Sequence, residues 1–252
     1  MLVVQTMLKA LVRGRLHIGL VTAGAMFVFV AVLLQELAIG ESQRALVAIG
    51  LAAHALVTDA TAVATAFVLT NTFLIGRGAI PLVARPRSRA SFVVSAVIAL
   101  CIATTISSLA LGSALAAVAS IYDAPAPLVL LAASVATGEA LILGLVAMAL
   151  RIRFASVFST ATVCAVFLMG RLSGLLAEML ERGTFGLLNP ILSAFHAIVP
   201  NLRLFDWTFL AVGGGGDPGV VVPLIYALLY GCALMVLAIL MHRRADFARE
   251  DG

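Results

Sequence analysis

The sequence predicts an all-α polytopic membrane protein with six transmembrane helices. Of its 252 residues, 63% are hydrophobic and 11% are charged, whereas soluble domains average about 45–50% and 25%. This surplus of apolar residues excludes a cytosolic enzyme. Six apolar stretches also reach the roughly 17–25 residues that a membrane-spanning helix needs. They cover residues 18–37, 45–74, 91–119, 128–150, 155–179 and 220–241. We treat the whole chain, 1–252, as one transmembrane domain.

The segment 1–17 precedes the first span and is expected to form an amphipathic helix. Gln5, Lys9, Arg13 and His17 recur at every fourth position, and apolar residues occupy most of the remaining positions. Such a helix lies in the membrane interface with its apolar side in the lipid. The alternative is an irregular extension of the first span.

The distribution of lysine and arginine predicts that both chain termini are cytoplasmic. Twelve basic residues lie on the side of the termini and three on the other side, and cytoplasmic loops carry the basic excess. The twelve are Lys9, Arg13, Arg15, Arg77, Arg85, Arg87, Arg89, Arg151, Arg153, Arg243, Arg244 and Arg249. The net charge of +4 therefore indicates contact with membrane lipids rather than with nucleic acid. A plasma (inner) membrane location is expected.

The segment 181–219 is the long external loop of this topology. It is too apolar for a solvated loop, so we expect one or two short helices in the outer membrane interface. Trp207 is expected at the level of the lipid headgroups, where tryptophan is enriched.

Four ionisable residues fall inside predicted spans: His54, Asp59, Glu139 and Arg171. Such residues are costly in a bilayer and usually face the bundle interior or a wet cavity. Glu139 lies about 16 Å and Arg171 about 13 Å from the outer surface on consecutive antiparallel helices. The two are therefore expected to form an ion pair, which either fixes helix register or lines a substrate path.

Asp59 lies about 21 Å from the outer surface, and three threonines follow the same helix nearby (Thr58, Thr61 and Thr65). We expect these hydroxyls to hydrogen-bond the acid or share water with it. A protonated core acid and a proton relay are both compatible with this pattern. Gly170 and Gly174 flank Arg171 at a spacing that lets two backbones approach closely.

Motifs for known chemistry are absent from the sequence. No Walker lysine motif, HExxH or GxGxxG occurs, and Cys101, Cys164 and Cys232 lie apart in apolar runs. We therefore expect no catalytic residues, no metal site and no cofactor bound by this chain.

Three short motifs, in order, resemble a known family. Residues 82–89 read LVARPRSR, Pro200–Asn201–Leu202 precedes Phe205, and a final apolar run with two tyrosines ends in HRRADF at 242–247. This series is similar to that of type II ABC exporter permeases, in the subgroup of copper-enzyme-maturation and nitrous-oxide-reductase-assembly permeases. One departure is that residues 73–78 lack the acidic residues that the family usually carries there.

The resemblance implies a six-helix subunit that dimerises with an identical or different permease copy. Two copies of a separate ABC ATPase would hold ATP and Mg, so this chain would not itself be an enzyme. The segment 76–89 would contact that ATPase, whereas the alternative is that its arginines serve topology alone. The implied coupling residues are Arg77, Arg85, Pro86, Arg87 and Arg89, and the implied external motif is Pro200, Asn201 and Phe205.

The sequence leaves three functions open. The first is the permease subunit of an exporter. The second is a secondary transporter that uses Asp59 or Glu139 as a proton-coupled site. The third is a membrane enzyme or assembly factor without transport activity.

Overall fold

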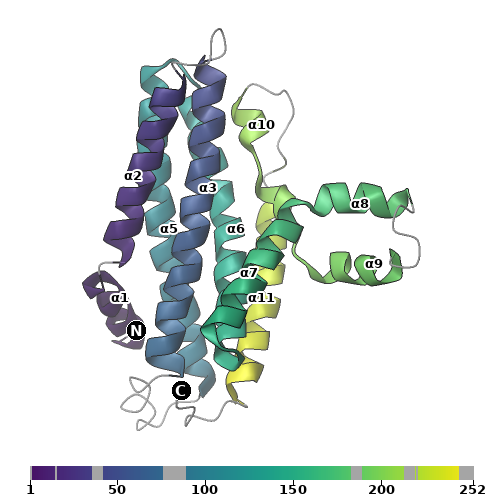
Figure 1. Ribbon diagram of the computed structural model, residues 1–252. Coiled ribbons are helices and arrows are strands. Elements are labelled where there is room, and N and C mark those ends of the chain that lie inside the picture. Colours follow the sequence, from purple (N-terminus) through teal and green to yellow (C-terminus); the bar gives the residue numbers. More distant parts are fainter. Residues whose placement is uncertain are drawn as a thin grey trace.

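All regular elements in the described part of the protein are helices. The computed structural model describes residues 2–14, 16–35, 42–75, 89–182, 189–212, 219 and 221–243, and within them no strand occurs. Figure 1 shows upright helices packed side by side, with two short helices projecting from one flank. The predicted all-α class is confirmed.

Four helices are long and apolar enough to cross a membrane, which makes this a multi-pass membrane protein by helix length and hydropathy. Their 22 to 33 residues correspond to about 33–50 Å at 1.5 Å per residue, against about 30 Å of hydrocarbon. They are α3 (Ser42–Leu69, continued by the π-helical turn η1, Thr70–Leu74), α5 (Arg89–Ile121), α6 (Ala126–Arg153) and α11 (Val221–Arg243).

The two remaining predicted spans have a different form. The first corresponds to α2 (Leu16–Gln35), whose apolar stretch Thr22–Leu34 is shorter than the other four. The fifth is divided into α7 (Ser156–Arg171) and α8 (Ser173–Glu181), which meet at an angle of 59°. By length and composition the described residues therefore supply four crossings, or five if the bent pair counts as one.

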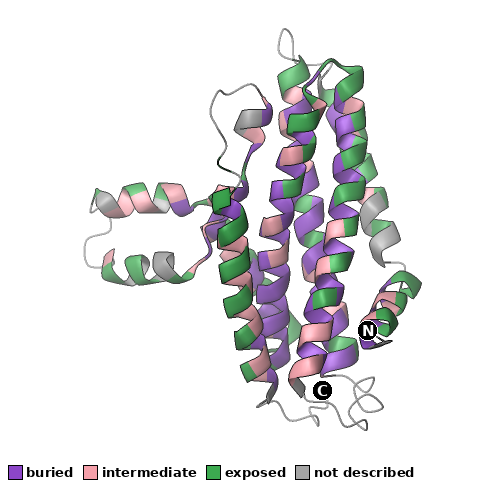
Figure 2. Cartoon of the chain, turned by 180° about the vertical axis from the view of Figure 1, so that it is seen from behind, coloured by how far each residue is buried: buried purple, intermediate pink, exposed green. Residues whose placement is uncertain are grey.

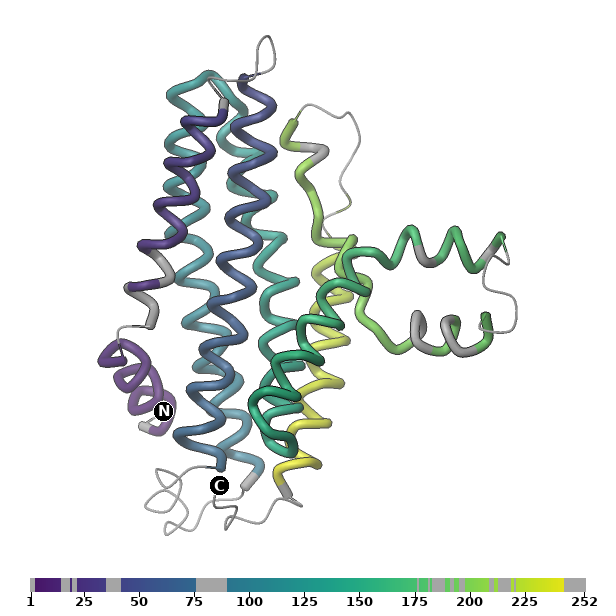
Figure 3. The backbone as a smooth tube through the Cα atoms, viewed as in Figure 1, coloured from purple at the N-terminus to yellow at the C-terminus, as the bar shows by residue number. Residues whose placement is uncertain are grey.

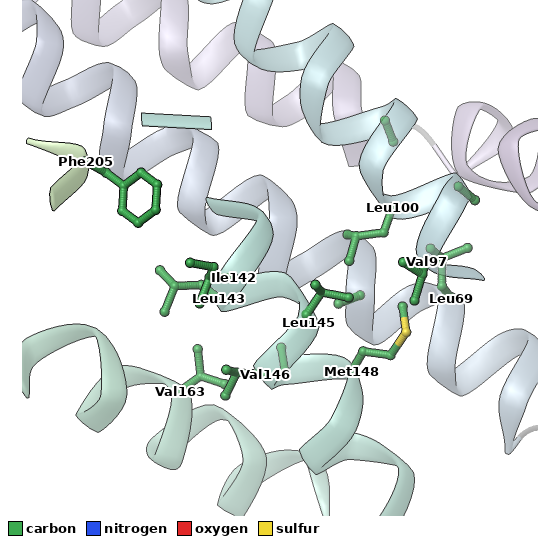
Figure 4. Packing of buried hydrophobic residues seen from close by; sticks show 14 of the residues in the cluster. Leu69, Val97, Leu100, Ile142, Leu143, Leu145, Val146, Met148, Val163 and Phe205 are labelled. Atoms are coloured by element: carbon green, nitrogen blue, oxygen red, sulfur yellow. The ribbon is translucent and has the colours of Figure 1, made fainter. Parts of the chain in front are cut away.

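Helix α6 is the centre of the bundle. It contacts α3, α5, α7 and α11, and 72% of its most apolar window is buried, against 11% for α11. Figure 2 shows burial concentrated on the inner helices. Leu100 and Ala62 lie 3.2–3.3 Å from where a Cβ on Gly144 would stand, so this glycine lets α3 and α5 approach α6 closely. Figure 4 shows the apolar side chains around this contact. On α6 they are Ile142, Leu143, Leu145, Val146 and Met148, and they pack among Leu69, Val97, Leu100 and Val163.

One end of the bundle carries the basic residues. Figure 1 places α1 and the end of α11 at this end, together with the end of α3, the start of α5 and the α6–α7 junction. Lys9, Arg13, Arg151 and Arg153 all lie on elements at this end. At the opposite end, a tight turn joins α5 to α6, and Asp123 adopts φ 57, a left-handed conformation that aspartate tolerates better than most residues.

The predicted N-terminal amphipathic helix is present as α1 (Leu2–Arg13). Val3, Met7 and Leu11 are buried and join the core, while Lys9 and Arg13 are exposed. The helix packs mainly on α5. Its most buried apolar side therefore faces protein, whereas the sequence pattern predicted contact with lipid.

The prediction of a continuous helix over 155–179 was wrong, because the helix breaks at Leu172. A segment from much later in the chain occupies the space above the end of α7. This segment contains η4 (Leu202–Phe205) and α10 (Thr208–Ala211). Figure 3 shows α7 ending at mid-height and the later segment rising from there to the upper end of the bundle. Two pieces that are distant in sequence therefore follow one another along this side of the bundle.

The predicted external loop does contain short helices. The helix α9 (Asn189–Ile198) packs beside α8, and this pair projects from the bundle. Trp207, expected at headgroup level, is instead 8% exposed. It follows η4 and leads into α10, which packs on α3 and α6, so the tryptophan is buried in protein.

Candidate functional site

The predicted ion pair forms between the middle of α6 and the end of α7. The Arg171 Nε donates to Oε1 of Glu139 at 2.7 Å, and its Nη2 donates to Oε2 at 2.7 Å. This bidentate arrangement is the strongest geometry for an arginine–carboxylate pair. Glu139 is fully buried, whereas the Arg171 side chain remains 27% exposed. The Glu139 carboxylate on α6 is therefore shielded from solvent, whereas the Arg171 guanidinium on α7 remains partly accessible.

Two further groups contact the arginine. Its Nη1 lies 3.6 Å from Oδ2 of Asp206, and its guanidinium carbon lies 5.8 Å from the ring centre of Phe167, one helical turn earlier. Asp206 is 44% exposed, and its Oδ1 accepts a hydrogen bond from the Thr208 N–H, which fixes the turn into α10. The cation is thus enclosed by one buried acid, one exposed acid and one aromatic ring.

Asp59 lies on α3, which packs against α6, the helix that carries Glu139. Asp59 is 6% exposed, and neither of its carboxylate oxygens has a hydrogen-bond partner among the described residues.

The predicted threonine partners of Asp59 turn away from it. The hydroxyls of Thr58 and Thr61 donate to the backbone carbonyls of His54 and Val57 at 2.7 Å. Thr65 has no hydrogen-bond partner among the described residues. The prediction that these hydroxyls satisfy the acid was therefore wrong, because local bonding to the preceding helical turn competes with it.

His54 lies in a separate polar network that joins α3, α5 and α6. Its Nε2 lies 3.0 Å from the carbonyl oxygen of Ser108 and 3.2 Å from the Ser108 hydroxyl. That hydroxyl in turn lies 2.7 Å from the hydroxyl of Thr137. All three side chains are buried. This network holds three helices in register and does not touch the ion cluster in any described contact.

The motif residues Pro200, Asn201 and Phe205 converge on the ion cluster. Leu202, within this motif, is fully buried beside Gly170, where an added Cβ would lie 2.6 Å from Leu202 Cγ and 2.8 Å from the Pro200 carbonyl oxygen. Phe205 packs against Gly138 of α6 in the same way. The glycine pair around Arg171 thus admits a loop segment of the same chain rather than another helix.

Asn201 links three elements. Its side-chain oxygen accepts a 2.8 Å hydrogen bond from Ser173 at the start of α8, and its backbone N–H donates to the Tyr226 hydroxyl on α11 at 2.8 Å. Tyr230, one turn later, donates to the Ile198 carbonyl at 2.7 Å and stacks on Tyr226. These contacts fasten the motif to α11 beside the cluster.

Sequence reasoning missed Asp206, Ser173 and Tyr226 as parts of this site. Asp206 directly follows the motif phenylalanine and is an acid in an otherwise apolar stretch, a signal that could have identified it. The roles of Ser173 and Tyr226 depend on contacts across 25 to 28 residues of chain, and no local pattern marks them.

Of the implied ATPase-coupling residues, Arg89 begins α5. The other four lie outside the described residues: Arg77, Arg85, Pro86 and Arg87. The described residues also contain no group of three or more histidine, cysteine, aspartate or glutamate side chains arranged to hold a metal ion.

The arrangement is one arginine that binds Glu139 and lies 3.6 Å from Asp206, inside an apolar bundle. Such a cluster can hold a proton, bind a charged group of a substrate or fix helix positions. Comparisons of the chain with protein-family models, with curated proteins and with solved structures give no match.

Proposed function

We propose that this chain is the membrane-spanning permease subunit of an ATP-binding-cassette exporter. In this proposal it crosses the plasma membrane six times, with both termini cytoplasmic. It pairs with a second permease copy, identical or different, and two copies of a separate ATPase bind ATP and Mg beneath them.

The observation that carries this proposal is the position of the motif segment 200–205. This is one of the three motifs that resemble the exporter permeases, and it joins α6, α7, α8 and α11 through Gly138, Gly170, Ser173 and Tyr226. A permease without an ATP site must transmit movement from its cytoplasmic end to its outer half. A segment that fastens these helices together at the ion cluster provides a continuous mechanical connection for that purpose.

The two ends of the bundle fit the same proposal. The segment 76–88 connects η1 to α5, and both of these elements meet it at the basic end of the bundle, where α1 also lies. Because basic residues mark the cytoplasmic side, this end faces the ATPase in the proposal. The count of six crossings takes α2 as the first, and α7 with the segment 200–212 as the fifth.

Co-purification with the candidate ATPase encoded beside this chain tests the proposal. In the double variant Arg85→Glu and Arg89→Glu, insertion and topology should persist, since ten of the twelve basic residues on that side remain. Association with the ATPase and ATP turnover should fall, because acidic groups now face its docking surface.

The matched control is Arg182→Glu, which reverses a charge that is 71% exposed, just after α8 and outside the motif segment. It should leave association and turnover unchanged. Equal association and turnover in the Arg85/Arg89 variant and the wild type would remove the segment 76–89 from any coupling role.

The ion cluster supports a second candidate, a secondary transporter driven by protons. Asp59 and Glu139 are buried acids on the adjacent helices α3 and α6, and acids inside a membrane often mark proton relays. Liposomes that contain the chain alone, with a pH-sensitive dye inside, discriminate the two candidates. Proton flux without any ATPase favours the secondary transporter, whereas a requirement for the ATPase and ATP favours the exporter subunit.

A further inference from the structure

Asp59 stands out because it is buried without a partner. Its side chain is 6% exposed and both oxygens lack a hydrogen-bond partner among the described residues. Buried polar groups are nearly always hydrogen-bonded, and buried charges are nearly always paired. An ionised Asp59 in this position would break both rules at once.

Among the described residues, Arg171 is the cation that acts electrostatically on Asp59. Helix α6 contributes Glu139, and α7 contributes Arg171. The helices α2 and α5 also pack on α3, but between residues 18–35 and 90–121 they contain no lysine, arginine, aspartate or glutamate. Two hydrogen bonds already commit Arg171 to Glu139. An ionised Asp59 would therefore be a second anion beside one neutralised pair.

A proton resolves this imbalance more readily than a metal ion does. Metal ions such as Ca²⁺ need six to eight oxygen ligands at about 2.3–2.6 Å. The described residues contain no group of three acids, histidines or cysteines that could supply such a site. A proton needs only the carboxylate itself.

The solvent exposure of the side chains decreases from Asp206 through Arg171 to Glu139 on α6. The Asp206 side chain is 44% exposed, Arg171 is 27% exposed and Glu139 is fully buried. Polar groups therefore extend from the accessible Asp206 to the buried Glu139, with Arg171 between them. Asp59 lies on α3, the neighbour of α6, and is 6% exposed. Ionisable groups in membrane helices usually face the bundle interior or a wet cavity, so the end of this row at Asp206 is where water has access.

We propose that Asp59 is a proton-binding site within the bundle, and that its proton exchanges with water on the side where Asp206 is exposed. On loading, the Asp59 carboxylate takes a proton from hydronium and becomes a neutral carboxyl group, and water is left. On release the proton returns to water, and Arg171 keeps its own protons throughout. This site operates in either candidate function, because it requires neither the ATPase nor a transported substrate.

Infrared spectroscopy of the full chain in lipid nanodiscs tests the proposal. At neutral pH the wild type should show the carbonyl stretch of a protonated carboxyl group. Asp59→Asn, which resembles the neutral acid in shape, should remove this band. The matched control is Asp123→Asn, the same change at an exposed acid whose φ of 57 asparagine tolerates. It should leave the band unchanged.

Two results would overturn the site assignment: no such band in the wild type, or a band that Glu139→Gln removes and Asp59→Asn does not. If Asp59→Asn fails to fold, isotope labelling of the aspartate carboxyls in the wild type provides the answer. The band then shifts if an aspartate holds the proton and stays in place if Glu139 holds it. In the second case the proposal is wrong.

A separate measurement tests the route by which the carboxyl proton exchanges with water. Transfer of the nanodiscs into D₂O shifts the carboxyl band as the proton is replaced, and the rate of this shift reports access. Asp206→Asn should slow the shift several-fold, whereas Asp123→Asn should not. An unchanged rate in Asp206→Asn would overturn the outer route. Because no ATPase is present, these results are independent of the test of the exporter proposal.

Discussion

Arg171 and Glu139 face each other through two parallel hydrogen bonds, each 2.7 Å long, that join the end of α7 to the middle of α6. Glu139 lies thirteen residues into α6, about 20 Å along the helix axis. The pair is located where α7 ends and the motif segment begins to pack. Its loss should therefore affect several elements together.

Single replacement of either partner should destabilise the protein strongly. Glu139→Leu leaves the arginine with only the exposed Asp206, 3.6 Å away. Arg171→Leu leaves a buried carboxylate uncompensated, at a cost of about 3 kcal/mol or more. The double variant should regain much of this loss, because no buried charge remains. Unfolding in mixed micelles measures all three variants as a double-mutant cycle.

The ion pair Glu178–Arg182 on α8 provides the control. It has the same two residue types one helical turn apart, and both side chains are more than half exposed. Exposed pairs of this kind contribute only about 0.3–0.5 kcal/mol, so Glu178→Leu and Arg182→Leu should change stability little. Simple additivity of the Glu139 and Arg171 replacements would show that the two residues are not coupled.

The sequence was sufficient to predict this pair, because two ionisable residues at similar depth on consecutive antiparallel helices have few alternatives. It was not sufficient to predict the break at Leu172. The stretch 155–179 is predominantly apolar. The break coincides with Leu202 and the Pro200 carbonyl packing onto Gly170 from about thirty residues later in the chain. Local periodicity carries no information about such a contact.

The surroundings of Asp59 show a second limit of sequence reasoning. Threonines near a buried acid are plausible donors, yet Thr58 and Thr61 donate to carbonyls one turn earlier in their own helix. The sequence cannot distinguish these two outcomes, because the hydroxyl rotamer decides between them. The burial of Trp207 was likewise not predictable from the sequence, because it depends on how the segment 200–212 packs against α3 and α6.

Gly170→Ala should destabilise the protein, because the added Cβ would lie 2.8 Å from the Pro200 carbonyl oxygen and 2.6 Å from Leu202 Cγ. A backbone atom cannot move aside as a flexible side chain can. Overpacking of this kind costs about 1–3 kcal/mol, which exceeds the gain of about 0.8–1 kcal/mol in helix propensity.

The matched substitution is Gly19→Ala in α2, where nothing lies within 4 Å of the added Cβ. This variant should be as stable as the wild type or slightly more so. Thermal midpoints in the same detergent compare the two variants. A midpoint for Gly170→Ala equal to that of Gly19→Ala would show that the motif segment does not pack on α7 as closely as the structure indicates.

Tyr226→Phe should cost about 1 kcal/mol, because it removes the acceptor for the backbone N–H of Asn201. An N–H group has one hydrogen to donate, so its loss of a partner is costly where water is excluded. Tyr230→Phe is the control. It removes a donor to the Ile198 carbonyl, and an under-satisfied carbonyl is better tolerated. Hydrogen exchange at the Asn201 amide should accelerate in Tyr226→Phe alone, and equal acceleration in both variants would contradict this role for Tyr226.

The last prediction separates protein packing from lipid binding in α1. Leu11 is 2% exposed in the core beneath this helix, while its neighbour Val12 is 70% exposed. Leu11→Ser should lower stability by about 2–4 kcal/mol through lost apolar burial and a cavity, and should release α1 to protease. Val12→Ser changes a residue of similar character without touching the core, so stability should stay within about 0.5 kcal/mol.

If instead α1 is held by lipid, Val12→Ser should weaken its attachment at least as much as Leu11→Ser does. Thermal midpoints together with limited proteolysis of α1 in nanodiscs distinguish these outcomes, since only packing on α5 makes the buried leucine the more sensitive of the two positions.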